Sequence, residues 1–211
     1  MAFEELGKMI GSFFSPEETF EKEKEYSSFG SAFINSSLFT VLLLFLTGLI
    51  LLSFESNLPG FFASKLNLSF PNTFFLFQLN AKYLFLGCLF AILGFFIVNS
   101  YFSFFGQIGG KLFGQTGEFT MQFYSNSLWL GLESLLLFFG ILLTLFFTPL
   151  AVWLGSWVYY MPLTVMAILF LYSFRVLAES YKVNQKMNLF QGFLTFLLAL
   201  VIPVALIVFL G

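Results

Sequence analysis

Residues 125–174 read SNSLWLGLESLLLFFGILLTLFFTPLAVWLGSWVYYMPLTVMAILFLYSF, and the only charged side chain among them is Glu133. This run of about 50 residues is too long for a single membrane-spanning helix, which needs about 20 mostly apolar residues. It is long enough to span the hydrocarbon twice, with a division at Pro149 and the Gly155–Ser156 pair. The sequence therefore predicts two transmembrane helices here, near 125–148 and 151–174.

Three further stretches have the same character, near 31–54, 83–105 and 187–210. In hydrocarbon the backbone amides and carbonyls must be paired within the segment, so each stretch is expected to be helical. The prediction is an all-α integral membrane protein with five transmembrane helices. Residues 1–30 are a charged N-terminal segment, and residues 31–211 form the membrane domain.

The composition excludes several functional classes. The chain is 59% hydrophobic and 9% charged, which is too apolar for a soluble domain. It has no histidine and no aspartate, so the commonest metal ligand and a common general base are missing. We therefore expect no enzyme activity, no cofactor and no metal site. The net charge of −2 gives no basic surface for nucleic acid.

Basic residues predict the orientation. With the N-terminus in the cytoplasm, only Lys65 and Lys82 lie outside, and the other basic residues lie inside: Lys8, Lys22, Lys24, Lys111, Arg175, Lys182 and Lys186. The C-terminus is then expected outside. The membrane would be the plasma membrane in a prokaryote, or the endoplasmic reticulum or Golgi in a eukaryote.

The first residues predict an amphipathic helix over 2–14, with apolar side chains at helical spacing and Glu4, Glu5 and Lys8 opposite them. Seven glutamates among residues 1–26 argue against binding to anionic lipid. We expect this helix to dock on the protein's own inner face or on a partner. A second helix is predicted from Ser15 as N-cap, with Pro16 in the first turn and Glu18 at N3.

Polar residues in a membrane segment are the default place to look for function. Most of the candidates fall in the predicted inner half of the membrane: Asn35, Asn99, Tyr124, Asn126, Glu133, Arg175 and Glu179. They could form hydrogen bonds between helices or line a binding site that faces the inner leaflet or the cytoplasm. A carboxylate in hydrocarbon needs a partner, and Arg175 is the expected partner of Glu133.

Two glycine patterns have different interpretations. Gly109, Gly110 and Lys111 lie in a predicted loop over 106–124 that invites comparison with a phosphate-binding loop. The comparison fails, because the first glycine is too close and Leu112 replaces the required Ser or Thr. Small residues at 87, 91 and 94 form a stripe that predicts close approach of another helix.

The chain resembles the Yip-domain family in several short motifs. They are Ser15-Pro16-Glu17-Glu18-Thr19-Phe20, Gly109-Gly110-Lys111, the stretch FTMQFYS at 119–125, LYSFRVL at 171–177 and KVNQK at 182–186. The resemblance implies five transmembrane helices, a cytoplasmic N-terminus and a role in membrane organisation or trafficking. In eukaryotic members it also implies a Rab GTPase partner.

The chain departs from that family at two places. No proline follows Tyr124, where the sequence continues Ser125-Asn126-Ser127, and the long Pro-rich N-terminus of eukaryotic members is missing. The second departure favours a prokaryotic or archaeal member. We expect a non-enzymatic protein that organises lipids, another membrane protein or further copies of itself at the cytoplasmic face. Two alternatives remain open: an accessory subunit of a larger complex, and a small-solute or lipid transporter that uses Glu133.

Overall fold

The computed structural model describes residues 2–53, 81–115 and 117–210, and its regular elements are all helical. The N-terminal segment holds α1 (Ala2–Phe14), α2 (Pro16–Glu23) and the short helix η1 (Lys24–Tyr26). The next elements are α3 (Phe29–Ser31), the π-helical turn η2 (Ala32–Ser36) and α4 (Ser37–Ser53). The long helices are α6 (Ala81–Leu112), α7 (Phe119–Leu154), α8 (Tyr160–Gln185) and α9 (Leu189–Leu210), with η4 (Ser156–Tyr159) between α7 and α8. The predicted loop 55–82 lies almost wholly outside the described residues.

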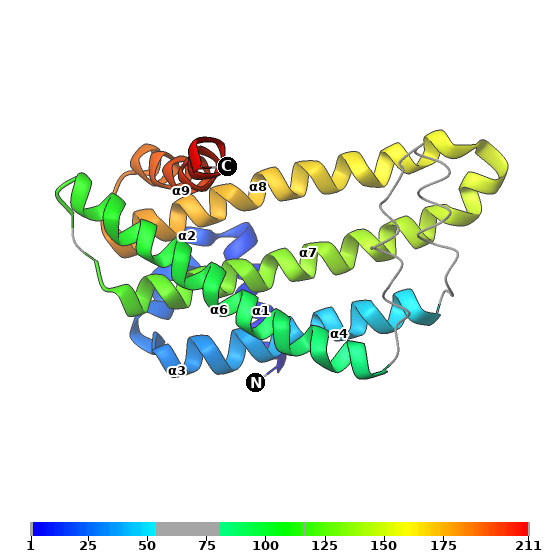
Figure 1. The fold of residues 1–211 in the computed structure, drawn as a ribbon, viewed down its shortest axis with the longest axis horizontal. Helices are drawn as coiled ribbons and strands as arrows, with labels where there is room; N and C mark the ends of the chain where they lie inside the picture. The colour runs from blue at the N-terminus through cyan, green and yellow to red at the C-terminus, as the bar shows by residue number, and fades with distance from the viewer. Residues whose placement is uncertain (1, 54–80, 116, 211) are drawn as a thin grey trace.

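Four long helices, α4, α6, α7 and α8, lie lengthwise in an elongated bundle (Figure 1). We call the end that holds the α7–α8 turn the turn end. The opposite end holds the last residues of α6 and α8 and the first of α7, and we call it the network end. The N-terminal helices α1 and α2 pack against α7 and α8. The fold is thus a helical hairpin, α7–α8, with other helices packed on its two sides.

Within the described residues, four segments are long and apolar enough to cross a membrane: Phe29–Gly48, Leu86–Leu112, Phe119–Thr144 and Trp157–Gln185. Their outward surfaces are apolar, as for Phe90 (70% exposed) and Phe146 (73% exposed). Large exposed apolar surfaces of this kind mark contact with lipid or with another protein. The structure is therefore that of an all-helical protein with several helices able to cross a membrane.

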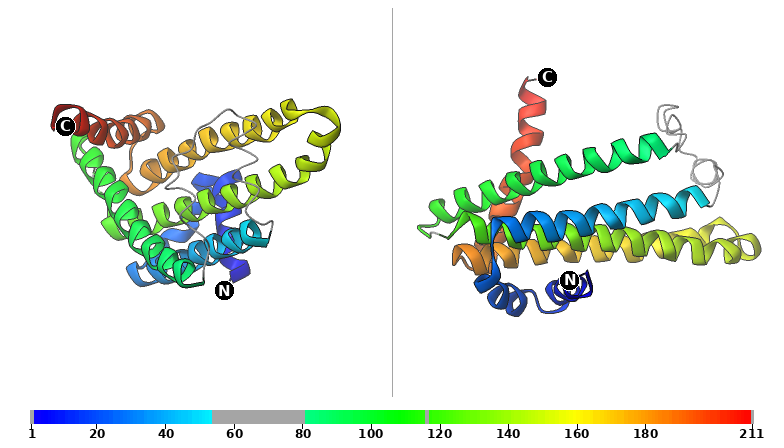
Figure 2. Two further views of the ribbon diagram at one scale, coloured as in Figure 1. Left: turned by 45° about the vertical axis from the view of Figure 1, so that its right-hand side comes forward. Right: turned by 90° about the horizontal axis from the view of Figure 1, so that it is seen from below.

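The predicted count of five spans is not confirmed. Helix α9 is apolar, but it runs across the direction of the other long helices (Figure 2). It packs against α6 and α8 near the network end. Helix α9 is therefore not parallel to the four long helices of the bundle.

The boundary between the third and fourth predicted spans lies further along the chain than expected. Helix α7 continues through Pro149 to Leu154, and α8 begins at Tyr160 in place of 151. A proline removes one backbone donor, which a helix in a bundle tolerates. The break occurs at Gly155, whose φ of 89° is open to glycine and strained for other residues.

The network end is also more helical than the sequence predicts. Helix α6 runs to Leu112 and α7 starts at Phe119, so most of the predicted loop over 106–124 is helix. Helix α8 continues beyond 174 to Gln185, where Lys186 adopts a left-handed conformation with φ 55°. The polar residues of these extensions do not end the helices, because side chains such as Gln122 and Gln185 are buried against one another.

Candidate functional site

A network of buried polar side chains joins α6, α7 and α8 at the network end. The Gln122 amide donates to Asn126 Oδ1 at 2.7 Å and to Ser180 Oγ at 3.0 Å. The Asn126 amide in turn donates to Ser103 Oγ at 3.0 Å. Asn99 donates to the backbone carbonyl of Phe123 at 3.0 Å. Two of the predicted site residues, Asn99 and Asn126, therefore belong to one network.

The network continues to the ends of the helices. The Gln185 side chain accepts from the backbone N–H of Gly117 at 3.1 Å, and Asn184 donates to Ser125 Oγ at 2.8 Å. Each bond ties the start of α7 to the end of α8. A largely satisfied buried network rigidifies a packed core. We interpret this network as structural, since its polar groups form hydrogen bonds from one helix to another.

Tyr124 and Glu179 lie apart from this network and face the N-terminal segment. The Tyr124 hydroxyl donates to Glu23 Oε2 at 2.7 Å, and Lys8 Nζ is 3.5 Å from the same hydroxyl. Glu179 pairs with Lys182 at 3.3 Å, and Lys182 also pairs with Glu17 of α2 at 2.6 Å. These contacts fasten α1 and α2 to the hairpin.

Lys8 is the ionic centre of the N-terminal segment. Its ammonium group lies 3.1 Å from Glu23, 3.3 Å from Glu5 and 3.7 Å from Glu4. Burial alone would lower the pKa of Lys8, but the hydrogen bond to Glu23 and the charges of Glu5 and Glu23 outweigh it, so the pKa is raised above 10.5. Lys8 is therefore held in its charged form.

Helix α1 uses its apolar face to dock on the protein itself. Met9 is 0% exposed and lies against Gly131 of α7, where an added Cβ would come within 2.2 Å of the Met9 methyl group. Phe13 packs on Tyr172 of α8, with ring centroids 4.8 Å apart.

At the start of α2, Ser15 is the N-cap residue but makes no capping hydrogen bond through its side chain. Glu18 pairs with Lys22 instead of closing the predicted capping box.

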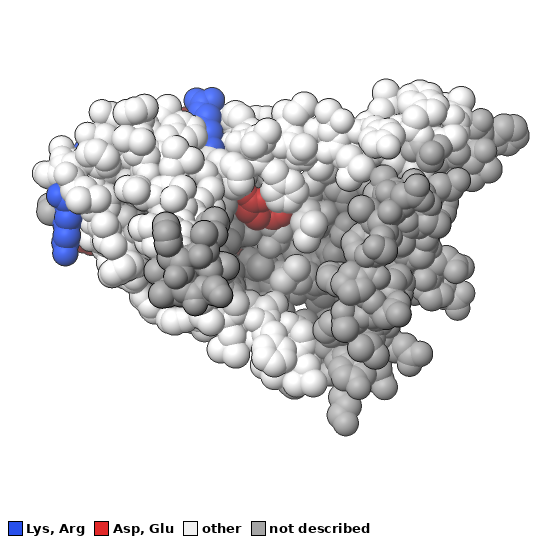
Figure 3. All heavy atoms as spheres, turned by 45° about the horizontal axis from the view of Figure 1, so that its top comes forward, with Lys and Arg blue, Asp and Glu red and all other residues white. Residues whose placement is uncertain are grey.

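Glu133 lies on another side of α7, in a groove of about 330 Å³ between α4, α6 and α7. Of the described residues that line the groove, Glu133 is the only charged one. The hydroxyl of Ser173 donates to Glu133 Oε1, whereas Oε2 is buried with no partner among the described residues. The indole N–H of Trp129, one turn earlier, is close to Glu133 but does not meet hydrogen-bond geometry. Figure 3 shows an acidic patch in a hollow of an otherwise uncharged part of this face.

The expected ion pair between Glu133 and Arg175 is not formed. Arg175 is exposed, and its guanidinium lies over the ring of Tyr172 at 5.5 Å from the centroid. The reason is helical geometry, because residues two apart point about 200° from each other. Since Ser173 faces Glu133, Arg175 faces away.

The predicted loop residues have packing roles. Gly109 and Gly110 lie in the last turn of α6, and an added Cβ at Gly109 would meet Thr195 of α9 at 2.2 Å. At Gly110 the same atom would meet the Gln185 side chain at 2.8 Å. Lys111 is exposed beside them. Asn35 lies in the π-helical turn η2, and its side chain is outside the described part of the structure.

The small-residue stripe on α6 does not contact another helix in the described structure. A Cβ added at Gly87 or at Gly94 would have no atom within 4 Å. Ala91 and Gly94 instead line the groove beside Glu133. The predicted close helix approach is thus absent at these two glycines, and the stripe leaves space in the groove.

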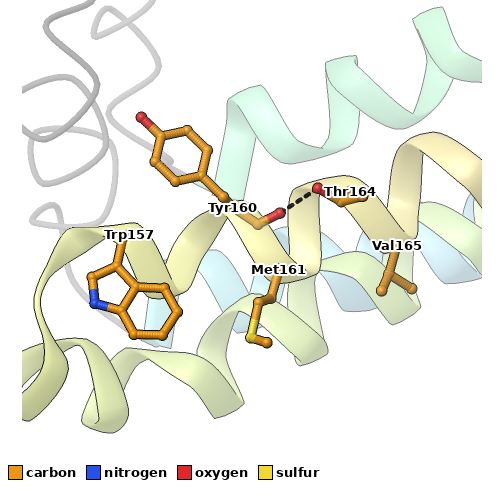
Figure 4. Close-up of a pocket in the computed structure, with 5 residues that line it drawn as sticks. All are labelled: Trp157, Tyr160, Met161, Thr164 and Val165. Atoms are coloured by element: carbon orange, nitrogen blue, oxygen red, sulfur yellow. Dashed lines mark hydrogen bonds between the residues drawn. The ribbon is translucent and has the colours of Figure 1, made fainter.

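A second hollow, of about 460 Å³, lies far from these polar groups at the start of α8 (Figure 4). Its lining comes from Trp157, Tyr160, Met161, Thr164 and Val165, and the Thr164 hydroxyl is taken up by the backbone carbonyl of Tyr160 at 2.7 Å. Exposed Trp and Tyr side chains are typical of a membrane–water interface. We therefore take this hollow as lipid-facing surface and regard the groove at Glu133 as the stronger candidate site.

Sequence reasoning missed the hydroxyl groups that accompany Glu133. Ser173 and Thr40 come from α8 and α4, and only the packing of three helices brings them to the groove. Thr40 is a single hydroxyl residue within an apolar stretch, and nothing in the sequence indicates that it lies beside Glu133. Ser173 could have been found from its distance of two residues from Arg175, had the other face of the helix been considered.

Bundle, groove and apolar exterior together define an all-helical, multi-pass membrane protein. In the described part of the chain, no three His, Cys, Asp or Glu side chains gather in a way that could hold a metal ion. Comparison with family models, with curated proteins and with solved structures gives no match to this chain.

Proposed function

We propose that this protein organises lipids or protein partners at one face of the membrane, the face of the network end, and that it performs no catalysis. The observation that carries the proposal is the combination of a rigid polar network with a docked N-terminal segment at that end. The buried network fixes the helix ends, and the docked segment presents charged side chains such as Glu18 and Lys22 next to an apolar bundle. The resemblance to the Yip-domain family supports the same role, and a GTPase partner rests on that resemblance alone.

The charge distribution supports a cytoplasmic network end. Cationic side chains at or near this end include Lys8, Lys24, Lys111, Lys182 and Lys186. Cytoplasmic segments are enriched in Lys and Arg. The N-terminal segment, which docks near this end, would then be cytoplasmic as well.

We further propose that α9 is a fifth transmembrane helix. It has 22 residues and would be about 33 Å long, which matches a hydrocarbon core of about 30 Å. Its exposed apolar side chains include Leu197, Leu200 and Val201. A helix of this length and apolar character is stable when it crosses the membrane.

A lipid or small-solute transporter is the second candidate, favoured by one observation. Among the described residues that line the groove, Glu133 supplies the one carboxylate, and its Oε2 makes no hydrogen bond to them. Intramembrane carboxylates often mark transport pathways. A transporter requires the groove to open alternately to both faces, whereas an organiser requires stable complexes at one face.

Site-specific photo-crosslinking in native membranes tests the proposal. Crosslinkers placed at the exposed positions Lys111 and Lys186 probe the network end, and one at Trp157 probes the turn end as a matched control. Mass spectrometry after mild detergent extraction should find the same protein or lipid at both network-end positions and not at Trp157. Equal, unselective labelling at all three positions would contradict an organising role at one face.

A further inference from the structure

The groove beside Glu133 holds acceptors that make no hydrogen bond to the described residues. They are Glu133 Oε2, which has the indole of Trp129 nearby, and the hydroxyl of Thr40, which is 6% exposed and lines the same groove. The nearest cationic candidate, Arg175, points away. A buried acceptor without a donor is costly, and a buried carboxylate more so. The groove is therefore complementary to a ligand that brings a positive charge and N–H groups.

The remaining walls of the groove are apolar. They include Leu44, Phe95, Leu137 and Phe170, and the small residues Ala91 and Gly94 leave space along α6. A hydrocarbon chain packs against such walls without a polar partner. The same ligand should thus combine a cationic amine with an acyl chain.

Glu133 lies at a height where a lipid headgroup could reach it. It precedes Leu154, at the end of α7, by 21 residues, a rise of about 32 Å, close to the thickness of the hydrocarbon core. The exposed rings of Trp157 and Tyr160 set the turn end at one interface. Measured from that interface, Glu133 lies toward the network end of the bundle, at the level where Arg175 is exposed and α1 docks on Gly131.

We propose that this groove binds a phospholipid with a primary-amine headgroup, whose ammonium group lies on the Glu133 carboxylate and whose acyl chain lies along Ala91 and Gly94. The inference rests on the proposed function and specifies the lipid. A protonated primary amine has three N–H donors, which suit Glu133 Oε2 and the Thr40 hydroxyl. A quaternary amine carries the same charge but has no N–H donor.

Lipid selectivity of the purified full chain tests this assignment. The protein is reconstituted in nanodiscs of phosphatidylcholine with increasing phosphatidylethanolamine, and bound lipid is measured by native mass spectrometry. The wild type should prefer phosphatidylethanolamine by about tenfold or more, which corresponds to about 1.4 kcal/mol. Glu133→Gln keeps the shape and removes the charge, so it should abolish the preference. Arg175→Met is the matched control and should keep it.

A second variant keeps the test decisive if Glu133→Gln does not fold. Gly94→Leu fills the groove from an open position on α6 and should displace the lipid while the bundle remains folded. Equal binding of the two lipids by the wild type, or an unchanged preference in Glu133→Gln, would overturn the proposal. Competition by free ethanolamine at millimolar concentration would assign the site to a soluble amine and also overturn it.

The two proposals can fail separately. Loss of lipid preference with intact crosslinks at Lys111 and Lys186 would remove the amine-lipid site and leave the organising role. A persistent lipid preference without any specific crosslink would do the reverse.

Discussion

At the scale of single residues, glycines on the same helix have opposite surroundings. Gly109 faces Thr195 of α9 so closely that an added Cβ would lie 2.2–2.9 Å from three of its atoms, one of them the Thr195 Cβ. Gly87 faces open space. The sequence analysis placed Gly109 in a loop and Gly87 in a stripe that predicts close helix approach, because a glycine carries no sign of which neighbour will approach it.

Gly109→Ala should lower the thermal stability of the purified protein in detergent. The new methyl group forces α6 and α9 apart, and overpacking of this kind costs about 1–3 kcal/mol. Gly87→Ala is the control and should be neutral or slightly stabilising, since alanine favours a helix. Circular dichroism at the helix band measures both transitions. Equal melting temperatures for the two variants would contradict the close α6–α9 contact.

At the scale of elements, the N-terminal segment is held by one buried apolar side chain and one ionic cluster. Met9 supplies the first, and Lys8 with Glu5 and Glu23 supplies the second. The amphipathic pattern predicted helix α1, but it could not distinguish Met9 from Ile10, which is 42% exposed. That distinction depends on where Gly131 allows close approach.

Met9→Asp should release α1 from the bundle, because a carboxylate cannot be buried against Gly131 without a partner. Limited trypsin digestion in mild detergent should then cleave at Lys8 and Lys22 faster than in the wild type. Ile10→Asp is the control with the same charge at an exposed position and should change the rate much less. If both variants resist trypsin as the wild type does, docking does not depend on Met9.

Lys8→Met should weaken the same docking by about 1–2 kcal/mol, since it leaves Glu5 and Glu23 close together without a cation. The pKa of Lys8 is raised in the folded protein, so the ionic contribution is fully present below pH 10.5 and is lost as the pH rises through the folded value. At pH 8, trypsin should therefore cleave at Lys22, a site that both proteins keep, more slowly in the wild type than in the variant. Hydrogen exchange of α1 measured at increasing pH should converge for the two proteins only above pH 10.5.

At the scale of the whole molecule, composition was sufficient to predict the class but not the arrangement. Apolar length indicated helices and a membrane, because backbone groups in hydrocarbon have few alternatives. Helix ends and the direction of α9 depend on contacts between distant residues, such as Gly109 with Thr195 and Gln122 with Ser180. Asn99 and Asn126 were predicted to cluster and do so, whereas Arg175 left the cluster because one helix cannot aim both Ser173 and Arg175 at α7.

Cysteine labelling with an impermeant thiol reagent tests the topology, on a background where Cys88 is replaced by serine. Cysteines at positions 21 and 186 should react from the same side of the membrane, and one at position 157 from the other. A cysteine appended after Gly211 decides the number of spans. If α9 crosses the membrane, this cysteine should be labelled from the same side as position 157. If α9 lies in the membrane plane, it should be labelled from the same side as position 21.

The position of Gly131 only two residues before Glu133 has a thermodynamic consequence. Met9 of α1 rests on one side of α7, and the groove opens on another side of the same turn. A ligand that binds more tightly when α1 is docked must, by reciprocity, strengthen the docking of α1 by the same factor. The wall of α7 between them would then couple the groove to the N-terminal segment without any movement of the rest of the bundle.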